Sequence, residues 1–232
     1  MWRRVIDEAI EALARGRPVM IHDSGGREDE IDLVYYAGSV GADEVYTLRT
    51  RAGGLICYAT TLNVVRSLNL MFMDELLEKI GGIYRSLAVK LPSYGDRPAF
   101  VLWVNHVATK TGISDDDRAL TIRKLHEVTD MVIRGDIERA RRAFESEFQS
   151  PGHVPLLAAR SLDVRRGHTE LSIALTKLAG LRPSVVFAEM LTRGGRLRLE
   201  EARVLAEKNG WPLVEGDHIV EACRNDAVCR GD

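Results

Sequence analysis

The chain has 232 residues, of which 45% are hydrophobic and 28% charged, and its formal net charge is -2 at pH 7. This is the balance of an ordinary globular protein that can bury a sizeable core, and it provides no global positive field for nucleic acid or a membrane surface. Charged residues interrupt the first 14 positions, which excludes a signal peptide, and no apolar run is long enough to span a membrane. We therefore expect a cytoplasmic protein.

The first half of the chain is predicted to alternate short strands with helices. Hydrophobic periodicity predicts helices over 2–14, 41–51 and 74–80. Short apolar runs predict strands over 18–22, 31–36 and 55–60, with a polar loop over 23–30. The stretch from 61 to 98 is the least legible part of the sequence.

The second half continues this irregular alternation. Ser114 is the expected N-cap of a long helix, and Pro151 is expected to open a loop. Helices are predicted over 115–133, 168–179, 200–208 and within 214–224, and strands over 100–104, 154–159 and 184–191. This order predicts a mixed sheet with helices packed against it, in a single domain spanning 1–232.

An acidic loop between two predicted strands is the first candidate site. Arg27 is followed by four carboxylates within five positions, at Glu28, Asp29, Glu30 and Asp32. In an extended segment Glu28, Glu30 and Asp32 would share one side, and Asp29 would face the other. Like charges this close require a cation or raised pKa values, and hard oxygen ligands suit Mg²⁺. A solvated acidic turn explains the same residues equally well.

A second candidate site precedes the helix that is predicted to begin at His168. Arg165, Arg166 and Gly167 stand just before it, and Gly167 would let the backbone turn tightly. The first amides of a helix, with arginines beside them, form a favourable site for a phosphate. His168 could also ligate a metal through a neutral imidazole. An ordinary capped helix with solvated arginines is the alternative.

Three further residues are worth following individually. His153 stands just before an apolar strand, where it could act as a proton shuttle or simply as a surface residue. Glu189 lies in an otherwise apolar strand, and a carboxylate there needs a partner or a function. Thr111 precedes the Ser114 cap, where phosphate contacts and simple capping are both open.

The three cysteines form neither a zinc pattern nor an even disulfide framework. Cys57 could be a reactive thiol, although a buried structural cysteine is more common. Cys223 and Cys229 could pair, but a reducing compartment favours free thiols, which we expect here.

Taken in order, these segments resemble the 3,4-dihydroxy-2-butanone 4-phosphate synthase family of riboflavin biosynthesis. The matching motifs are 23–33 with an R-E-x-E-x-D core, 54–58, 110–118, 151–154, 165–170, and 179–181 with Glu189. One such motif would arise by chance, whereas six in sequence are specific. The resemblance implies an α+β fold of three layers (α/β/α), with a mixed sheet flanked by helices.

The resemblance also implies an activity and a set of site residues. The family converts D-ribulose 5-phosphate into 3,4-dihydroxy-2-butanone 4-phosphate and formate, with Mg²⁺ or Mn²⁺ as its only cofactor, and works as a homodimer with sites near the interface. Metal ligands fall on Glu28 and His168, with two ions expected. Catalytic positions fall on His153, Glu189, Glu30, Asp32 and Cys57. Substrate contacts are expected from Arg27, Glu28, Asp32, Thr111, Arg165, Arg166, Gly167, His168, Thr169 and Glu189.

Some positions depart from the family pattern. Asn105 stands where the family usually has an aspartate, and it cannot serve as an anionic ligand or a base. The stretch 61–98 carries little resemblance, and the loop between His153 and His168 is short. These departures indicate a divergent, archaeal-type member. The zinc cluster of the GTP cyclohydrolase domain that many relatives carry is absent from the sequence, so we expect a monofunctional chain.

Three alternatives stay open at this point. The first is a non-catalytic phosphate- or nucleotide-binding module on a related three-layer fold, of the kind seen in threonylcarbamoyl-adenylate synthases. The second is another metal-dependent lyase or aldolase that acts on sugar phosphates, and the third is an inactive paralogue kept for its dimer interface. Metal-dependent binding of a pentose phosphate and release of formate would distinguish them.

Overall fold

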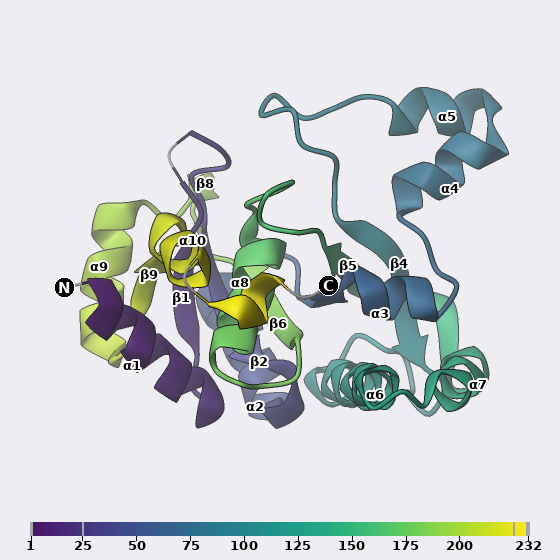
Figure 1. The fold of residues 1–232 in the computed structure, drawn as a ribbon, viewed down its shortest axis with the longest axis horizontal. Helices are drawn as coiled ribbons and strands as arrows, with labels where there is room; N and C mark the ends of the chain where they lie inside the picture. The colour runs from purple at the N-terminus through teal and green to yellow at the C-terminus, as the bar shows by residue number, and fades with distance from the viewer. Residues whose placement is uncertain (1, 25, 225, 231–232) are drawn as a thin grey trace.

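The computed structural model describes residues 2–24, 26–224 and 226–230 (Figure 1). The strands are β1 (Val19–His22), β2 (Ile31–Tyr36), β3 (Cys57–Thr61), β4 (Phe100–His106), β5 (Phe148–Ala159), β6 (Ser184–Glu189), β7 (Leu191–Thr192), β8 (Gly195–Arg196) and β9 (Leu213–Glu215). The α-helices are α1 (Trp2–Ala14), α2 (Ala42–Thr47), α3 (Leu62–Ser67), α4 (Met73–Ile80), α5 (Gly82–Ala88), α6 (Asp115–Ile133), α7 (Ile137–Glu147), α8 (His168–Leu178), α9 (Leu199–Asn209) and α10 (Gly216–Arg224). Within this part of the chain, no helix is both long and apolar enough to cross a membrane.

Seven strands form one mixed sheet in the order β4-β5-β3-β6-β2-β1-β9, and β7 and β8 form a separate hairpin. The pairs β1–β9 and β3–β5 are parallel, and the other neighbours in the sheet are antiparallel. The expected mixed sheet is therefore confirmed. The register places Asp32 of β2 opposite Glu189 of β6, and Cys57 of β3 opposite Phe187 of β6.

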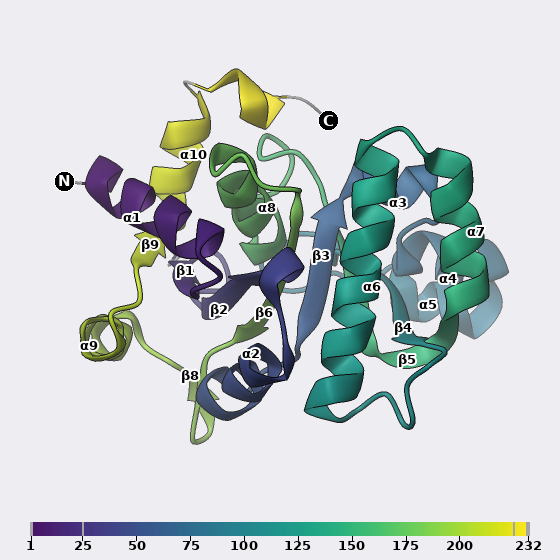
Figure 2. The ribbon, with the colours of Figure 1, turned by 90° about the horizontal axis from the view of Figure 1, so that it is seen from below.

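Alternating side chains bury both faces of this sheet. Leu33 and Ala188 belong to one hydrophobic cluster, which packs against helices such as α6, whereas Val34 and Phe187 belong to another, which packs against α1, α8 and α10. Successive side chains of a strand point to opposite faces of the sheet, so a sheet that is apolar on both faces requires helices on both sides. The predicted three-layer α/β/α arrangement is confirmed, and its layers can be followed in Figure 2.

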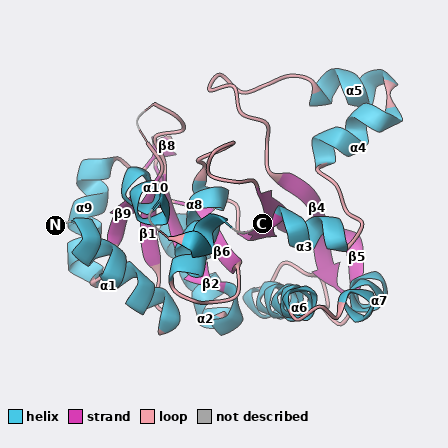
Figure 3. Cartoon of the chain, in the orientation of Figure 1, coloured by secondary structure: helices cyan, strands magenta, loops and turns pink. Residues whose placement is uncertain are grey.

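Helices α4 and α5 project from the rest of the fold at the end of the sheet that carries β4 (Figure 3). No residue of α5 is buried, and Ile83, Tyr84 and Leu87 are 71%, 51% and 59% exposed. A helix that does not turn an apolar stripe to the core lacks the periodicity by which helices are recognised. This explains why the sequence between 61 and 98 was hard to interpret.

The region around Pro151 differs from the sequence prediction. We predicted a loop at Pro151 followed by a strand from 154, but β5 already begins at Phe148. Its pairing with β4 passes from Gln149 directly to Val154, so residues 150–153 form an extended bulge. Proline cannot donate to a strand ladder and is tolerated at such a bulge. Helix α7 and strand β9 were not predicted.

The cysteine prediction also requires correction. Cys223 and Cys229 form a disulfide, with Cα atoms 5.4 Å apart, whereas free thiols were expected. The pairing is possible because a short 3₁₀ helix (Ala227–Arg230) packs back against α8 and α10. The amino-acid composition does not predict that this segment folds back onto the two helices. Cys57 is free and buried, as the more common alternative predicted.

The bulge in β5 provides a test of the packing at this edge. A Cβ at Gly152 would lie 2.0 Å from the backbone carbon of Val104, whereas a Cβ at Gly195 would meet nothing within 4 Å. We expect Gly152→Ala to lower the free energy of unfolding by about 2 kcal/mol, because backbone must move to accommodate it. Urea unfolding is the measurement and Gly195→Ala the matched control. Equal midpoints for the two variants would contradict the described packing.

Candidate active site

A cavity of about 340 Å³ lies where the starts of β2 and β3 meet the end of β6 and the N-terminus of α8. Its polar lining comes from segments that are far apart in sequence. The members predicted as site residues are Glu28, Glu30, Asp32, Cys57, Arg165, His168, Thr169 and Glu189. The fold thus brings most of the predicted site together.

Asp23 organises the acidic loop. Its Oδ2 accepts hydrogen bonds from the backbone N–H of Glu28 (3.1 Å) and from Nη1 of Arg27 (3.2 Å), and its Oδ1 accepts one from the N–H of Glu30 (3.1 Å). Asp29 has a positive φ of 53°. Glu28 and Glu30 consequently face the cavity, as predicted, although a looped backbone rather than an extended one separates them from Asp29.

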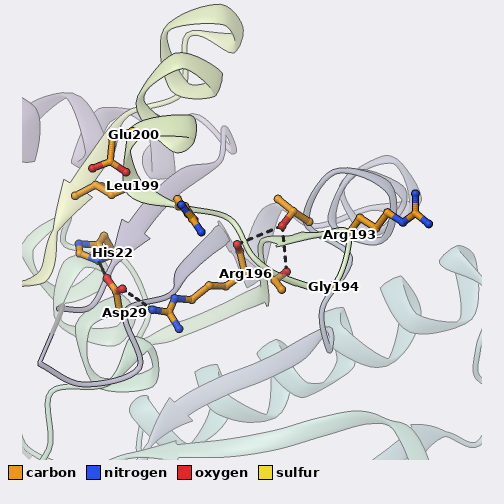
Figure 4. A pocket seen from close by; sticks show the side chains of 10 residues that line it. His22, Asp29, Arg193, Gly194, Arg196, Leu199 and Glu200 are labelled. Carbon is orange, nitrogen blue, oxygen red and sulfur yellow. Dashed lines mark hydrogen bonds and ion pairs between the residues drawn. The ribbon is translucent and has the colours of Figure 1, made fainter.

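Asp29 points into a different cavity, of about 770 Å³, on the side of the β7–β8 hairpin (Figure 4). Its carboxylate accepts a hydrogen bond from Nη2 of Arg196 (2.6 Å) and lies 3.0 Å from Nε2 of His22. This second cavity is larger, but it does not gather the cluster of carboxylates and histidine that lines the smaller one. We therefore place the chemistry in the smaller cavity.

His168 is oriented as a metal ligand would be. Its Nε2 lies 3.1 Å from the carbonyl oxygen of Glu30. Because a carbonyl oxygen can only accept, Nε2 carries the proton of this hydrogen bond, and Nδ1 is left to face the cavity. Nδ1 lies 3.6 Å from Oε2 of Glu28 and 3.7 Å from Oδ2 of Asp32. Asp23, Glu28 and His168 each offer one ligand atom, and these three atoms all lie within 4.8 Å of one another.

These donors fit a hard divalent cation. Carboxylate oxygens and one imidazole nitrogen would hold it, while waters and substrate oxygens could complete its coordination. Because Asp23 already accepts three hydrogen bonds, Glu28 and His168 are the more suitable ligands. The sequence did not single out Asp23, since its function is visible only in the folded loop.

The charges in the cavity shift one another's pKa. Burial disfavours the charged form of His168, but Asp32 and Glu28 outweigh this and raise its pKa to about 9. Burial raises the pKa of Asp32 to about 8, against the opposing effect of His168. Burial alone would raise the pKa of Glu28, but His168 and Arg27 lower it to about 2. Burial, with Glu28 and Glu189, raises the pKa of Glu30.

The N-terminus of α8 is a candidate anion site beside the acidic loop. Gly167 has φ -85°, which any residue adopts, so the expected tight turn does not explain it. The lack of space for a side chain explains the glycine, because a Cβ there would lie 2.3 Å from Nη1 of Arg165 and 2.8 Å from Nη2 of Arg27. Buried Nη2 of Arg27 and Nε of Arg165 have no hydrogen-bond partner among the described residues. Two guanidinium groups and free helix amides together suit a phosphate.

Glu170 holds this anion site in shape. Its buried carboxylate accepts hydrogen bonds from Arg165, from the N–H of Gly167 (3.1 Å) and from the N–H of Arg160 (3.0 Å). Arg166, by contrast, is exposed and its Nε donates to the carbonyl of Leu162 (3.2 Å). Arg166 therefore lies outside the cavity, although the sequence placed it among the substrate contacts.

Glu189 and Cys57 complete the sheet side of the cavity. Oε2 of Glu189 accepts a hydrogen bond from the N–H of Leu55 (2.8 Å), which is the partner that the sequence argument required. Cys57 is 1% exposed, and burial raises the pKa of its thiol well above the ordinary value. A protonated, buried thiol fits a packing role better than that of a nucleophile.

Two predicted site residues lie apart from the cavity. His153 is exposed on the bulge of β5, and β3 separates β5 from β6, a distance of roughly 10 Å between strand axes. Thr111 is exposed, and its N–H and hydroxyl both face Asp117 at 3.1 and 3.4 Å. Neither residue lines the cavity in a single copy of the chain.

Tyr94 is a cavity residue that the sequence did not indicate. Its ring lies 5.0 Å from the guanidinium carbon of Arg27, and Asp96 accepts a hydrogen bond from Nε of the same arginine (2.9 Å). Tyr94 belongs to the segment between α5 and β4, which lacks a periodic pattern. Only the clustered turn residues of 93–98 signalled a loop there.

The fold and the cavity are those expected of an α+β enzyme, with a candidate cation site beside groups that suit a small anion. A model of the 3,4-dihydroxy-2-butanone 4-phosphate synthase family matches residues 7–222. The chain belongs to this family. The enzyme of that name from Archaeoglobus fulgidus is 43% identical over 226 residues, covering 94% of this chain and 93% of the relative.

Solved structures agree with this membership. A 3,4-dihydroxy-2-butanone 4-phosphate synthase in complex with two magnesium ions superposes with a TM-score of 0.73 at 29% identity, over 94% of this chain and 95% of the other. A two-domain synthase from A. baumannii superposes with a TM-score of 0.76 at 26% identity. The match covers 96% of this chain and 59% of that one.

The shifted pKa values predict how the metal-free protein responds to pH. Protonated His168 stabilises the fold below its ordinary pKa of 6.5, and this stabilisation is lost as the pH rises through about 9. In EDTA we expect the free energy of unfolding to fall by on the order of 3 kcal/mol between pH 6.5 and 9.

Urea unfolding at several pH values measures this change. In His168→Gln the free energy of unfolding should fall less between pH 6.5 and 9, because the contribution of His168 is lost. A wild-type stability that is constant or rises over the same interval would contradict the described electrostatics.

Proposed function

We propose that this chain converts D-ribulose 5-phosphate into 3,4-dihydroxy-2-butanone 4-phosphate and formate, in riboflavin biosynthesis. The observation that carries the proposal is the meeting of Glu28 and His168 at 3.6 Å, beside an anion site formed by Arg165 and the start of α8. Metal ligands and a phosphate site in one cavity are what a phosphorylated ketose requires. Because a carbon–carbon bond is broken and formate leaves, the enzyme is a lyase.

The cation is best accounted for as Mg²⁺ or Mn²⁺, held by Glu28 and His168. A bound divalent ion polarises a carbonyl and stabilises the enediolate charge that follows proton loss from the adjacent carbon. The relative whose structure contains two magnesium ions supports two ions per site. The carboxylates of the cavity offer enough hard oxygen ligands for this number.

Binding and orientation of the substrate fall to the arginine side of the cavity. The side chains of Arg165 and Arg27 and the amides of His168 and Thr169 are proposed to hold the phosphate. Fixing this remote group orients the reacting carbons toward the acidic loop. Glu170 contributes indirectly, since it fixes Arg165 and the N–H of Gly167.

The proton transfers are assigned to the carboxylates on the acidic side of the cavity, opposite the arginines. Glu30 or Asp32 is proposed to remove the first proton, because both line the cavity next to the expected cation. Glu189, on the neighbouring strand, is proposed to serve a later transfer during dehydration and rearrangement. The buried thiol of Cys57 shapes the cavity wall and takes no proton.

The competing functions fit the cavity less well. A nucleotide-binding module depends on a basic groove, whereas four carboxylates converge here. An inactive paralogue would not need the paired orientation of His168 and Glu28. Another metal-dependent sugar-phosphate lyase would use the same residues, and release of formate separates it from the proposed reaction.

The decisive experiment measures formate released from D-ribulose 5-phosphate, with and without EDTA. We expect Mg²⁺-dependent release, and a loss of at least about 10²-fold in kcat for Glu28→Gln because a metal ligand is weakened. Asp29→Asn is the matched control, since its carboxylate faces the other cavity and its backbone is left-handed. Metal-independent formate release, or equal rates for both variants, would refute the assignment.

The location of His153 and Thr111 leads us to propose a homodimer with shared sites. Exposed apolar side chains occur on the same segments, since Trp103, which pairs with Pro155, is 38% exposed and Ile113 is 52% exposed. Exposed apolar surface of this kind marks an interaction site. A second copy that covers it could bring its own His153 to the cavity of the first, which a single copy cannot do.

Mixing two inactive variants tests the shared site. If one copy supplies Glu28 and the other His153, random dimers of Glu28→Gln and His153→Gln should regain about a quarter of the wild-type formate release, since half the dimers are mixed and each restores one site. Refolding the two variants together, against each refolded alone, is the comparison. Mixed dimers with no recovered activity would place both residues within one copy.

A further inference from the structure

Asn105, at the end of β4, holds both the backbone and the ring of His153. The N–H of His153 donates to Oδ1 of Asn105 (2.8 Å), and Nδ1 of the ring lies 3.1 Å from Nδ2. Asn105 is 4% exposed, whereas His153 is exposed on the bulge of β5. The buried amide therefore engages one edge of an exposed imidazole and leaves Nε2 unengaged by Asn105.

The orientation of the Asn105 amide follows from the backbone contact. A backbone N–H can only donate, so the amide atom that it meets at 2.8 Å must be the oxygen. The amide nitrogen then faces the ring, where it can only donate. Nδ1 of His153 consequently accepts this hydrogen bond, and the neutral ring carries its proton on Nε2. The competing contact from Nδ1 to Oδ1 is longer, at 3.3 Å.

Packing confines the side chain of Asn105, and its hydrogen bonds decide which way the amide faces. Gly112 has a φ of +86°, and a Cβ there would lie 2.1 to 2.4 Å from the side-chain atoms of Asn105. A Cβ at Gly152 would lie 2.3 Å from the backbone nitrogen of Asn105. Gly112 thus lies directly against the side-chain amide, and Gly152 lies against the backbone of Asn105. A half-turn would also place the amide nitrogen against the N–H of His153, donor against donor.

We propose that Asn105 is a positioning residue that fixes the tautomer of His153. The neutral ring presents an N–H at Nε2, so His153 donates a hydrogen bond to a substrate oxygen on which negative charge develops, and does not accept a proton there. An aspartate of the same shape would accept Nδ1–H and leave a lone pair at Nε2, which reverses this role. The catalytic consequence rests on the function and the shared site proposed above, whereas the tautomer does not.

Ring ¹⁵N spectra test the tautomer directly. In protein labelled with ¹⁵N-histidine, the His153 signals are identified as those missing from His153→Gln, among six histidines in the sequence. We expect the neutral ring to be protonated at Nε2 in the wild type and at Nδ1 in Asn105→Asp. A wild-type ring protonated at Nδ1 would overturn the inference, whether or not the protein releases formate.

Steady-state kinetics test the catalytic consequence. Asn105→Asp should lower kcat about tenfold, because the ring no longer donates to the developing oxyanion, while KM stays within about twofold. Asn63→Asp, at an exposed position of α3, introduces the same charge and should retain wild-type kinetics. A reversed tautomer with unchanged kcat would overturn the positioning role. A raised KM at constant kcat would do so as well.

Discussion

Repulsion among carboxylates is the constraint around which the rest of the site is arranged. Glu28, Glu30, Asp32 and Glu189 converge on one cavity, and Nδ1 of His168 lies 3.6 Å from Glu28 and 3.7 Å from Asp32. In the absence of a cation the cluster balances its charge with protons, which is why the pKa values of His168 and Asp32 are raised. A bound divalent ion would replace those protons, so metal binding and proton release are coupled. The chemistry of the site and the stability of the fold therefore depend on the same few charges.

The sheet and α8 divide the work of meeting this constraint. Strands β2 and β6 place Asp32 opposite Glu189, while α8 brings His168 and the phosphate-binding amides to the same end of the sheet. Two cores, one on each face, hold these elements rigidly enough for the charges to be positioned by packing. His153, on the bulge of β5, and Thr111, between β4 and α6, lie outside this cavity. This separation of the charged cavity from the exposed histidine is the reason why we propose a homodimer.

Much of this arrangement was predictable from the sequence, and for identifiable reasons. Helices α1, α6 and α8 and strand β2 carry clear periodicity and recognisable ends, so their bounds were predicted within a residue or so. The grouping of Glu28, Glu30 and Asp32 followed from alternation. Asp23, Glu170 and Tyr94 were not assigned roles, because their importance lies in contacts with backbone or side chains that the fold alone brings near. The Cys223–Cys229 bond and strand β9 likewise depend on the return of the chain, which no local pattern records.

The left-handed backbone at Asp29 has a consequence for the carboxylates on either side of it. Because Arg196 and the ring of His22 hold Asp29 from behind, and Asp23 ties down the amides of Glu28 and Glu30, the loop is fixed from both directions. The free energy cost of bringing these carboxylates together is therefore part of folding and does not arise again when a cation binds. A cation arriving later encounters a preorganised set of oxygens and loses little affinity to rearrangement of the loop.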